Sequence, residues 1–305
     1  MKICSLLPGA TEVVAALGLT NDLFGISHEC DYPPDVRHKP VMVRATIDFE
    51  STASREIDQQ VRTAAHQGRS LYALDEALFR RVQPDLVIAQ DLCHVCAVTP
   101  DQLQQALRAL PSPSETLALN PTRLDHVLVD IARIGAATGK ESEAQALIAS
   151  LRRRLGLIRE HVARAARRPR VACLEWLDPL FAAGHWVPDM VAWAGGHDVL
   201  GAEGAPSERI TWERLVSADP EIIVLMPCGF SIARTLHELS SLVSHSEWGR
   251  LPAVRNQRVF AVEAGAFFSR PGPRLIDGVA LLAALCHPLV FGEAAPLGAH
   301  RLNEG

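Results

Sequence analysis

One pattern occurs twice in the chain and restricts its fold more than any other feature. The segments "RRVQPDLVIA" (80–89) and "VSADPEIIVL" (216–225) each follow a helical stretch, carry a proline, and continue as a short apolar run. Proline cannot continue a helix, and the residue before it is disfavoured in helical backbone. Each segment therefore predicts a helix that stops before Pro84 or Pro220 and a buried strand that follows. The repeat predicts two similar α/β lobes.

The other elements fit this doubled plan. Residues 121–168 show no strand pattern, and their apolar residues recur at the spacing of two long helices. We therefore expect an α/β fold with two Rossmann-like lobes, residues 1–120 and 169–305, joined by the helices of residues 121–168. A ligand cleft is expected between the lobes. Further strands are predicted at residues 2–7, 23–26, 169–175 and 258–262, and helices at 10–18 and 188–196.

Charge and hydropathy exclude two classes of partner. The chain has 305 residues with 30 Lys and Arg against 35 Asp and Glu, so its net charge of −5 gives no reason to bind nucleic acid. The arginines of residues 152–170 are interpreted as a solvated helix face opposite an apolar stripe. No apolar run reaches the length of a membrane span, and "GVALLAALCHPLV" (278–290) is interpreted as a buried helix.

The N-terminus and the cysteines bear on location. "MKICSLLPGATEVV" has a short apolar run and then Glu12, without the longer apolar core and cleavage site of a secretory signal. The seven cysteines are an odd number in a chain too large to need disulfides. These features predict a cytoplasmic protein, or a periplasmic one if the true start lies upstream.

Unusual residues concentrate in the loops that follow predicted strands. In an open α/β sheet, ligands bind at the carboxyl ends of the strands, so these loops are expected to line the cleft. We expect the ligand-binding residues to be His28, Glu29, Cys30, Cys93, His94, Cys96, His185, Trp186, Cys228, Phe268 and Arg270.

The loop "QDLCHVCAV" (90–98) leaves three interpretations open. Two thiols separated by two residues can bind one soft metal ion, with Cys93, Cys96, His94 and His185 as candidate ligands. The same pair could be redox-active, since a capped helix start follows it and favours a thiolate. Small cysteines could also simply pack beneath the loop.

Other candidates also have structural interpretations. Trp186 precedes "VPDM", so it could form a hydrophobic staple or stack on a ligand. His28 and Cys30 could belong to a hydrogen-bonded turn before Pro33. Arg270 could hold an anionic or amide group of a ligand, or be an ordinary surface arginine.

Several of these segments carry a family resemblance. "SLLPGATEVVAALG", "GISHECDYP", "PDLVIAQDLCHVCAV", "WLDPLFAAGHWVPDMVAWAGG", "DPEIIVLMPCGF" and "FSRPGPRLIDGV" resemble the helical-backbone substrate-binding proteins of ABC importers, most closely those named cobalamin-binding. The resemblance covers nearly all of residues 1–290. It implies binding of a corrinoid (cobalamin) or similar metal chelate in the interlobe cleft, without catalysis. It also implies docking to an ABC permease through Glu213 and Glu76, although Glu76 is one residue out of register.

The chain also departs from the resemblance. The familiar B12 binders are exported and hold the corrin between aromatic side chains, whereas this chain has 5% aromatic residues. The alternative hypothesis is a cytoplasmic metal- or thiol-dependent protein that uses Cys30, Cys93, Cys96 and Cys228. No nucleophile, base and orienting group stand at a recognisable spacing, and no Gly-rich phosphate loop occurs, so we do not expect an enzyme.

Overall fold

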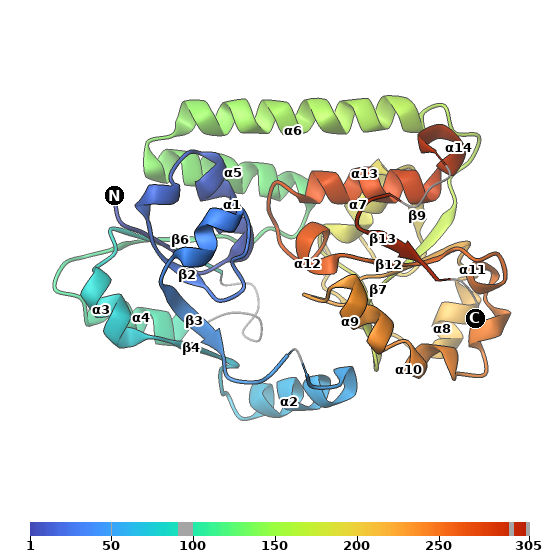
Figure 1. The fold of residues 1–305 in the computed structure, drawn as a ribbon, viewed down its shortest axis with the longest axis horizontal. Coiled ribbons are helices and arrows are strands. Elements are labelled where there is room, and N and C mark those ends of the chain that lie inside the picture. The colour runs from blue at the N-terminus through green and yellow to red at the C-terminus, as the bar shows by residue number, and fades with distance from the viewer. Residues whose placement is uncertain (50, 91–99, 293–295, 303–305) are drawn as a thin grey trace. The chain divides into compact units, whose positions relative to one another are not determined.

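The chain folds into two compact α/β units. A computed structural model describes residues 1–49, 51–90, 100–292 and 296–302 (Figure 1). The predicted fold class, two similar α/β lobes with helices between their sheets in the chain, is confirmed. The first unit comprises Met1–Thr52, Glu56–Asn120 and Asp125–Ala149, and the second comprises Ala53–Arg55, Pro121–Leu124 and Ser150–Gly305.

The first unit is built on a six-stranded sheet in the order β4-β3-β2-β1-β5-β6. All neighbouring strands are parallel except β3 and β4. The strands are β1 (Ile3–Ser5), β2 (Leu23–Ser27), β3 (Val41–Ala45), β4 (Tyr72–Leu74), β5 (Leu86–Ala89) and β6 (Glu115–Ala118). The helices that begin in the first 140 residues are α1 (Pro8–Ala16), α2 (Ser54–His66), α3 (Glu76–Val82), α4 (Pro100–Arg108) and α5 (Leu124–Thr138).

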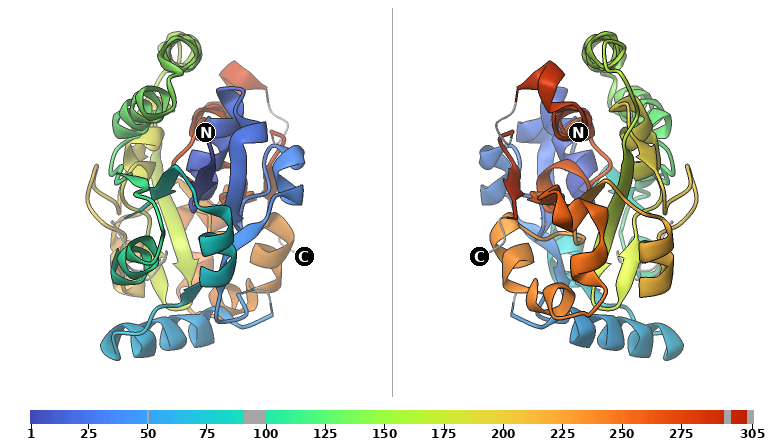
Figure 2. Two further views of the ribbon diagram at one scale, coloured as in Figure 1. Left: turned by 90° about the vertical axis from the view of Figure 1, so that its left-hand side faces the viewer. Right: turned by 90° about the vertical axis from the view of Figure 1, so that its right-hand side faces the viewer.

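The second unit has a seven-stranded sheet whose centre is the parallel set β7, β11 and β12. A hairpin joins β7 to β8, drawn in yellow-green in the right-hand view of Figure 2. The strands are β7 (Arg170–Leu177), β8 (Leu180–Ala182), β9 (His197–Asp198), β10 (Glu208–Arg209), β11 (Ile222–Leu225), β12 (Val259–Val262) and β13 (Ala299–Arg301). The helices are α7 (Val187–Trp193), α8 (Trp212–Ser217), α9 (Ile232–His237), α10 (Ser240–Val243), α11 (Pro252–Arg255), α12 (Ala264–Phe267), α13 (Leu275–Cys286) and α14 (Pro288–Phe291).

The doubled helix–proline–strand plan is present in the backbone of both units. Helices α3 and α8 each begin at a side-chain cap, with Asp75 accepting from Leu78 N and Thr211 accepting from Arg214 N. Each helix is followed by a residue in the left-handed region, Gln83 (φ 51°) or Asp219 (φ 47°), directly before the buried proline. This turn ends the helix and directs the chain into β5 or β11.

Long helices occupy the segment predicted as a joint. Helix α6 (Glu141–Val162) is one unbroken helix, drawn in green in Figure 1, and the boundary between the units falls within it, after Ala149. Every residue from 121 to 168 is described, and none of them lies in a strand. The joint predicted over these residues is thus shared between the two units.

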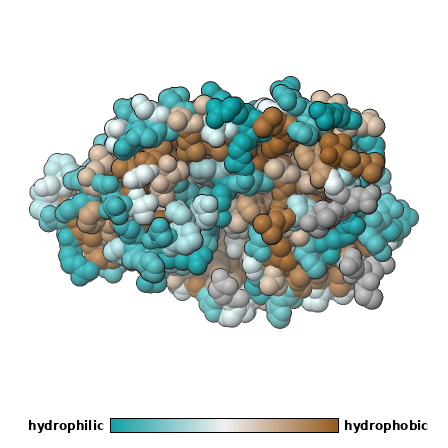
Figure 3. All heavy atoms as spheres, turned by 45° about the horizontal axis from the view of Figure 1, so that its top comes forward, coloured by the Kyte–Doolittle hydropathy of each residue, from teal (hydrophilic) through white to brown (hydrophobic). Residues whose placement is uncertain are grey.

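The arginines after residue 150 are mixed with acidic and apolar groups. Figure 3 shows the face that carries α6, where hydrophilic residues are interspersed with hydrophobic ones. Ion pairs join Arg154 to Asp277, Arg167 to Glu221, and Arg170 to Asp219. Paired arginines of this kind give no uniform basic patch, which fits the interpretation as a solvated helix face.

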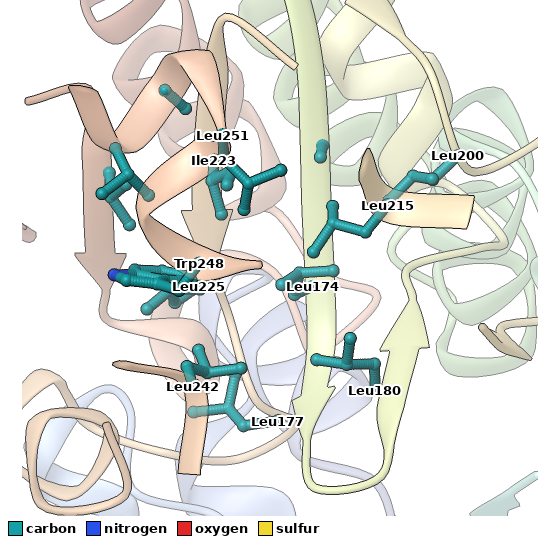
Figure 4. Close-up of a cluster of buried hydrophobic side chains, with 14 of the residues drawn as sticks. Leu174, Leu177, Leu180, Leu200, Leu215, Ile223, Leu225, Leu242, Trp248 and Leu251 are labelled. Carbon is teal, nitrogen blue, oxygen red and sulfur yellow. The ribbon is translucent and has the colours of Figure 1, made fainter. Parts of the chain in front are cut away.

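One face of the second sheet carries a dense apolar core. Leu174 of β7 and Ile223 and Leu225 of β11 are fully buried. Figure 4 shows them beside Trp248 and Leu251, which come from the segment that leads into α11. Burial of whole Leu and Ile side chains contributes about 1.5–3 kcal/mol each to folding. This core holds β7 and β11 in place, and so it fixes the positions from which the loops after these strands begin.

Candidate functional site

The carboxyl ends of β7, β11 and β12 converge at one edge of the second sheet, here called the second carboxyl edge. Strands β7 and β11 pair up to Leu174 and Leu225, and β11 pairs with β12 up to Ala261. The loops beyond are joined by backbone hydrogen bonds, because Cys228 N donates to Glu175 O (3.0 Å) and Ala264 N donates to Phe230 O (3.1 Å). This edge is where a parallel sheet presents loops to a ligand.

An aromatic pair stands on this edge. The ring of Trp176, at the end of β7, lies 5.3 Å from the ring of Phe230, centroid to centroid, at 59°. The guanidinium carbon of Arg234, in α9, lies 4.8 Å from the centroid of Phe230. Trp176 is half-buried and Phe230 is buried. A tilted aromatic pair with one partly open member is suited to contact the face of a planar ligand.

The arginines around this pair are matched by carboxylates of the chain itself. Arg234 forms an ion pair of 2.8 Å with Glu238. Arg55 donates from Nε to Asp178 at 2.9 Å and from a terminal nitrogen at 3.2 Å, a two-pronged contact. These two arginines are therefore paired with carboxylates of the protein, Arg234 in a pair of low exposure and Arg55 at an exposed position.

His185 and Trp186 lie on the same edge, at the entry to α7. Ala183 N donates to Cys173 O. The chain therefore leaves β8 beside the residues where the pairing of β7 with β11 ends. His185 adopts a left-handed backbone (φ 52°), and its N–H donates to Ala205 O at 2.6 Å. Such a conformation is uncommon for a non-glycine residue, and here it turns the chain from β8 into α7.

The chemistry of the two side chains differs. Burial lowers the pKa of His185, so its half-buried imidazole is neutral at neutral pH and can act as a metal ligand. Trp186 is buried, and its Nε1 donates to Phe268 O at 2.8 Å. The indole of Trp186 is therefore used in packing, whereas the imidazole of His185 is accessible to a ligand.

A close backbone contact holds His185 in place. A Cβ atom on Gly184 would lie 2.5 Å from Ala205 O, so only glycine fits there. Ser207, two residues on, donates from Oγ to Glu175 Oε2 at 2.8 Å. The segment from Ala205 to Ser207 thus connects the backbone of His185 with the carboxylate of Glu175.

The first sheet has its own carboxyl edge, with a smaller aromatic group. His28, directly after β2, is exposed, and its Nδ1 lies 3.2 Å from Val43 O. Its ring is 6.0 Å from that of Tyr72, which is 6.3 Å from that of Phe49. These side chains are of the type that lines sites for flat organic ligands.

Cys30, in the same loop as His28, faces the interior of the first unit. It is buried, and its Sγ lies 3.1 Å from Thr11 Oγ1, which in turn donates to Ser5 Oγ at 2.8 Å. Cys30 therefore contacts a hydrogen-bonded set of hydroxyl groups at the start of α1. Glu29, its neighbour, is half-buried.

The structure brings part of the predicted set together. His185, Trp186, Phe268 and the exposed Cys228 all belong to the second carboxyl edge, and Arg270 follows Phe268 there, half-buried. Cys93, His94 and Cys96 lie outside the described residues. In the part of the chain that is described, no three His, Cys, Asp or Glu side chains gather in a way that could hold a metal ion. The cleft predicted between the lobes stays a prediction.

Sequence reasoning missed several residues of this edge. Glu175 and Trp176 belong to the last residues of strand β7 and Phe230 to the loop after β11, and no spacing in the sequence marked their side chains. Arg234 and Glu238 lie in and just after α9, where an i,i+4 pair of opposite charge usually indicates a solvated helix face. Their low exposure, visible only in the fold, sets them apart.

Comparison with known proteins identifies the family. The family model described as periplasmic binding protein matches residues 3–265. The chain belongs to this family. Relatives of this binding protein include the ABC transporter substrate-binding lipoprotein YvrC of Bacillus subtilis, 24% identical over 298 residues, or 96% of this chain and 82% of the relative. The vitamin B12-binding protein of Vibrio cholerae is 24% identical over 281 residues, or 91% of this chain and 86% of the relative.

Solved structures share the fold of this binding protein. A periplasmic heme-binding protein from Pseudomonas aeruginosa superimposes with a TM-score of 0.73 at 21% identity, over 100% of this chain and 99% of the other. The periplasmic vitamin B12 binding protein BtuF of Vibrio cholerae gives a TM-score of 0.64 at 22% identity, over 93% and 96%. At these identities the likeness concerns the fold.

Family membership decides the coarse function and corrects one prediction. This is a substrate-binding protein of the ABC-importer type, from a family of non-catalytic proteins that bind small molecules and work with a permease. The predicted cytoplasmic location is wrong, because the family and the relatives named as lipoprotein or periplasmic point to an extracytoplasmic location. Among the described helices, none combines the length and apolarity needed to cross a membrane.

Proposed function

We propose that this binding protein carries a corrinoid such as cobalamin, held at the second carboxyl edge. The observation that supports this is the aromatic pair of Trp176 and Phe230 beside arginines that are already paired, Arg234 with Glu238 and Arg55 with Asp178. A planar ligand gains from aromatic contact, while the guanidinium group of Arg234, which is 13% exposed, already has a carboxylate partner in the protein. The place thus suits a flat metal chelate with neutral substituents.

The charge pattern favours a corrinoid over heme. A corrin ring carries amide side chains, whereas heme carries two carboxylates that require cationic partners in a protein. The relatives include proteins named for vitamin B12, and the structural neighbours include proteins named for heme, so both ligand classes occur among proteins of this fold. The paired state of Arg234 and Arg55 supports the first class for this chain.

His185 gives the same edge a possible metal contact. Its neutral imidazole is a good ligand for cobalt as well as for iron. The strained backbone that presents it is fixed by Gly184 and Ala205. We assign His185 as the described residue that would approach the metal of the chelate.

Titration of the purified protein with cobalamin tests the proposal. The visible spectrum of the ligand and the tryptophan fluorescence of the protein are followed together, with heme titrated in parallel. We expect saturable cobalamin binding that is weakened at least about fivefold in Trp176→Ala, since base-sized rings on aromatic side chains contribute about 1–3 kcal/mol. Trp193→Phe, a change in the half-buried end of α7, is the control and should bind as the wild type does.

Two results would remove the corrinoid assignment. One is the absence of cobalamin binding by the wild type. The other is heme binding that is much tighter than cobalamin binding, which would favour the carboxylate-bearing ligand. An unchanged ligand spectrum in His185→Ala would remove only the metal contact.

We propose that two exposed glutamates dock this binding protein onto its permease. Glu213 is the second residue of α8 and Glu76 is the first residue of α3, so they occupy near-equivalent first turns of the doubled plan. Backbone and Thr211 hydrogen bonds lower the pKa of Glu213, which keeps it charged. Glu76 is joined to Arg80 at 2.7 Å. We propose that Glu213 makes the stronger docking contact, because it has no such ion pair within its helix turn among the described contacts.

A further inference from the structure

A closed ring of contacts surrounds the aromatic pair of the second unit. Trp176 Nε1 donates to Ser54 O at 3.1 Å, and Ser54 Oγ donates to Glu238 Oε2 at 2.9 Å. Glu238 Oε1 pairs with Arg234 at 2.8 Å, and Arg234 lies over Phe230, which packs against Trp176. All of these residues belong to the second unit. The two oxygens of Glu238 thus have different partners.

The ion pair in this ring is largely withdrawn from solvent. The side chain of Arg234 is 13% exposed and that of Glu238 is 10% exposed. Solvent screens such charges poorly, so an unbalanced charge here would act strongly on a ligand at the neighbouring aromatic pair. A carboxylate of the protein, rather than water, is what neutralises Arg234.

We propose that Glu238 is a specificity-determining residue that neutralises the guanidinium group of Arg234 beside the aromatic pair and so disfavours carboxylate-bearing tetrapyrroles relative to neutral ones. The inference rests on the proposed function, because it takes the pair of Trp176 and Phe230 as the ligand contact. Glu238 acts through Arg234, whose guanidinium group would otherwise attract a ligand carboxylate. An anionic ligand that approaches the wild-type pair meets a cation that is already paired with the carboxylate of Glu238.

The test compares two porphyrins that differ only in charge. Hemin carries two free carboxylates, and its dimethyl ester has the same ring and iron with none. We expect Glu238→Gln to increase the ratio of hemin affinity to ester affinity by about tenfold, the effect of one unbalanced charge near the ligand at an intermediate dielectric. The glutamine keeps an acceptor for Ser54 and removes the negative charge. Cobalamin, titrated alongside, should bind no better to this variant than to the wild type.

Three matched variants control the interpretation. Ser54→Ala removes the hydroxyl hydrogen bond to Glu238 but leaves the one from the backbone N–H and both charges, so the ratio should stay at the wild-type value. The double variant Arg234→Gln with Glu238→Gln removes both charges and should also return the ratio to that value. Arg234→Gln alone leaves Glu238 unbalanced and should move the ratio in the opposite direction. This last variant also decides the matter if Glu238→Gln does not fold.

The outcomes separate the inference from the proposed function. An unchanged ratio in folded Glu238→Gln, or an equal change in Ser54→Ala, overturns the role of Glu238. Binding of neither porphyrin by any variant also overturns it, because no carboxylate-bearing ring would then need to be excluded by Glu238. Failure of the wild type to bind cobalamin overturns the corrinoid assignment, while the porphyrin ratio still measures the effect of Glu238.

Discussion

The indole Nε1 of Trp186 donates a 2.8 Å hydrogen bond to the carbonyl oxygen of Phe268, and both side chains are buried. The bond joins the start of α7 to the loop that follows α12. Replacing Trp186 with Phe should keep most of the apolar contact but leave that carbonyl without its donor. An unsatisfied buried acceptor costs about 1–3 kcal/mol, so we expect a loss of this size in the free energy of unfolding, measured in urea.

Trp193→Phe is the matched control for this change. Trp193 is half-buried at the end of α7, so its replacement should cost less than about 1 kcal/mol. Equal losses in the two variants would show that the hydrogen bond to Phe268 contributes nothing beyond packing.

The thiols of the described residues should differ sharply in reactivity. Burial raises the pKa of Cys4 and of Cys286 to about 12, and raises that of Cys173 well above its usual value, whereas Cys228 is exposed. Because the thiolate is the reactive species, iodoacetamide on the native protein should modify Cys228 and spare Cys4, Cys173 and Cys286. Peptide mass spectrometry reads the pattern, and the three should react only after denaturation. Rapid labelling of Cys173 in the native state would contradict the burial.

Stability should fall as the solution is acidified from about pH 7 to 5. Burial lowers the pKa of His287 and of His185 below the ordinary 6.5, so the unfolded chain binds protons at a higher pH than the folded one. The free energy of unfolding is therefore fully retained above the unfolded pKa and decreases as the pH drops through it, by up to about 1.4 kcal/mol per pH unit for each group.

His287→Gln should flatten this dependence. Glutamine can still donate to Gly195 O, which lies 3.2 Å from His287 Nε2, but it does not titrate. His66→Gln, at an exposed position at the end of α2, should keep the wild-type slope. Urea unfolding at a series of pH values measures both, and identical slopes for the two variants would refute the assignment to His287.

Charge reversal at Glu213 should weaken coupling to the importer. Glu213→Arg places a cation where we propose that a carboxylate meets a cationic group of the permease, so stimulation of the reconstituted transporter's ATPase should fall at least about tenfold, because like charges at an interface are strongly unfavourable. Ligand affinity should not change. Glu115→Arg, at an exposed position of β6, is the control. Full stimulation by Glu213→Arg would exclude a docking role for this residue.

The fold was largely predictable because its rules are local. A helix that stops at a proline and continues as an apolar strand can be recognised within ten residues, and both copies, before Pro84 and Pro220, form as predicted. The loops that follow the strands were predictable for the same reason. The location of the protein was not predictable in this way. The number of cysteines and the first residues suggested the cytoplasm, and neither feature identifies the compartment of a member of this family.

The sequence by itself determined the two α/β units, the helices between their sheets and the loops that carry His185, Trp186 and Cys228. Only the tertiary structure decided which residues the side chains in the loops of both units contact. Cys30 faces Thr11 inside the first unit, and Trp186 donates to Phe268. The physical reason is distance along the chain: Ser54, Trp176 and Glu238 meet through hydrogen bonds between segments more than 60 residues apart, and no local pattern encodes that contact.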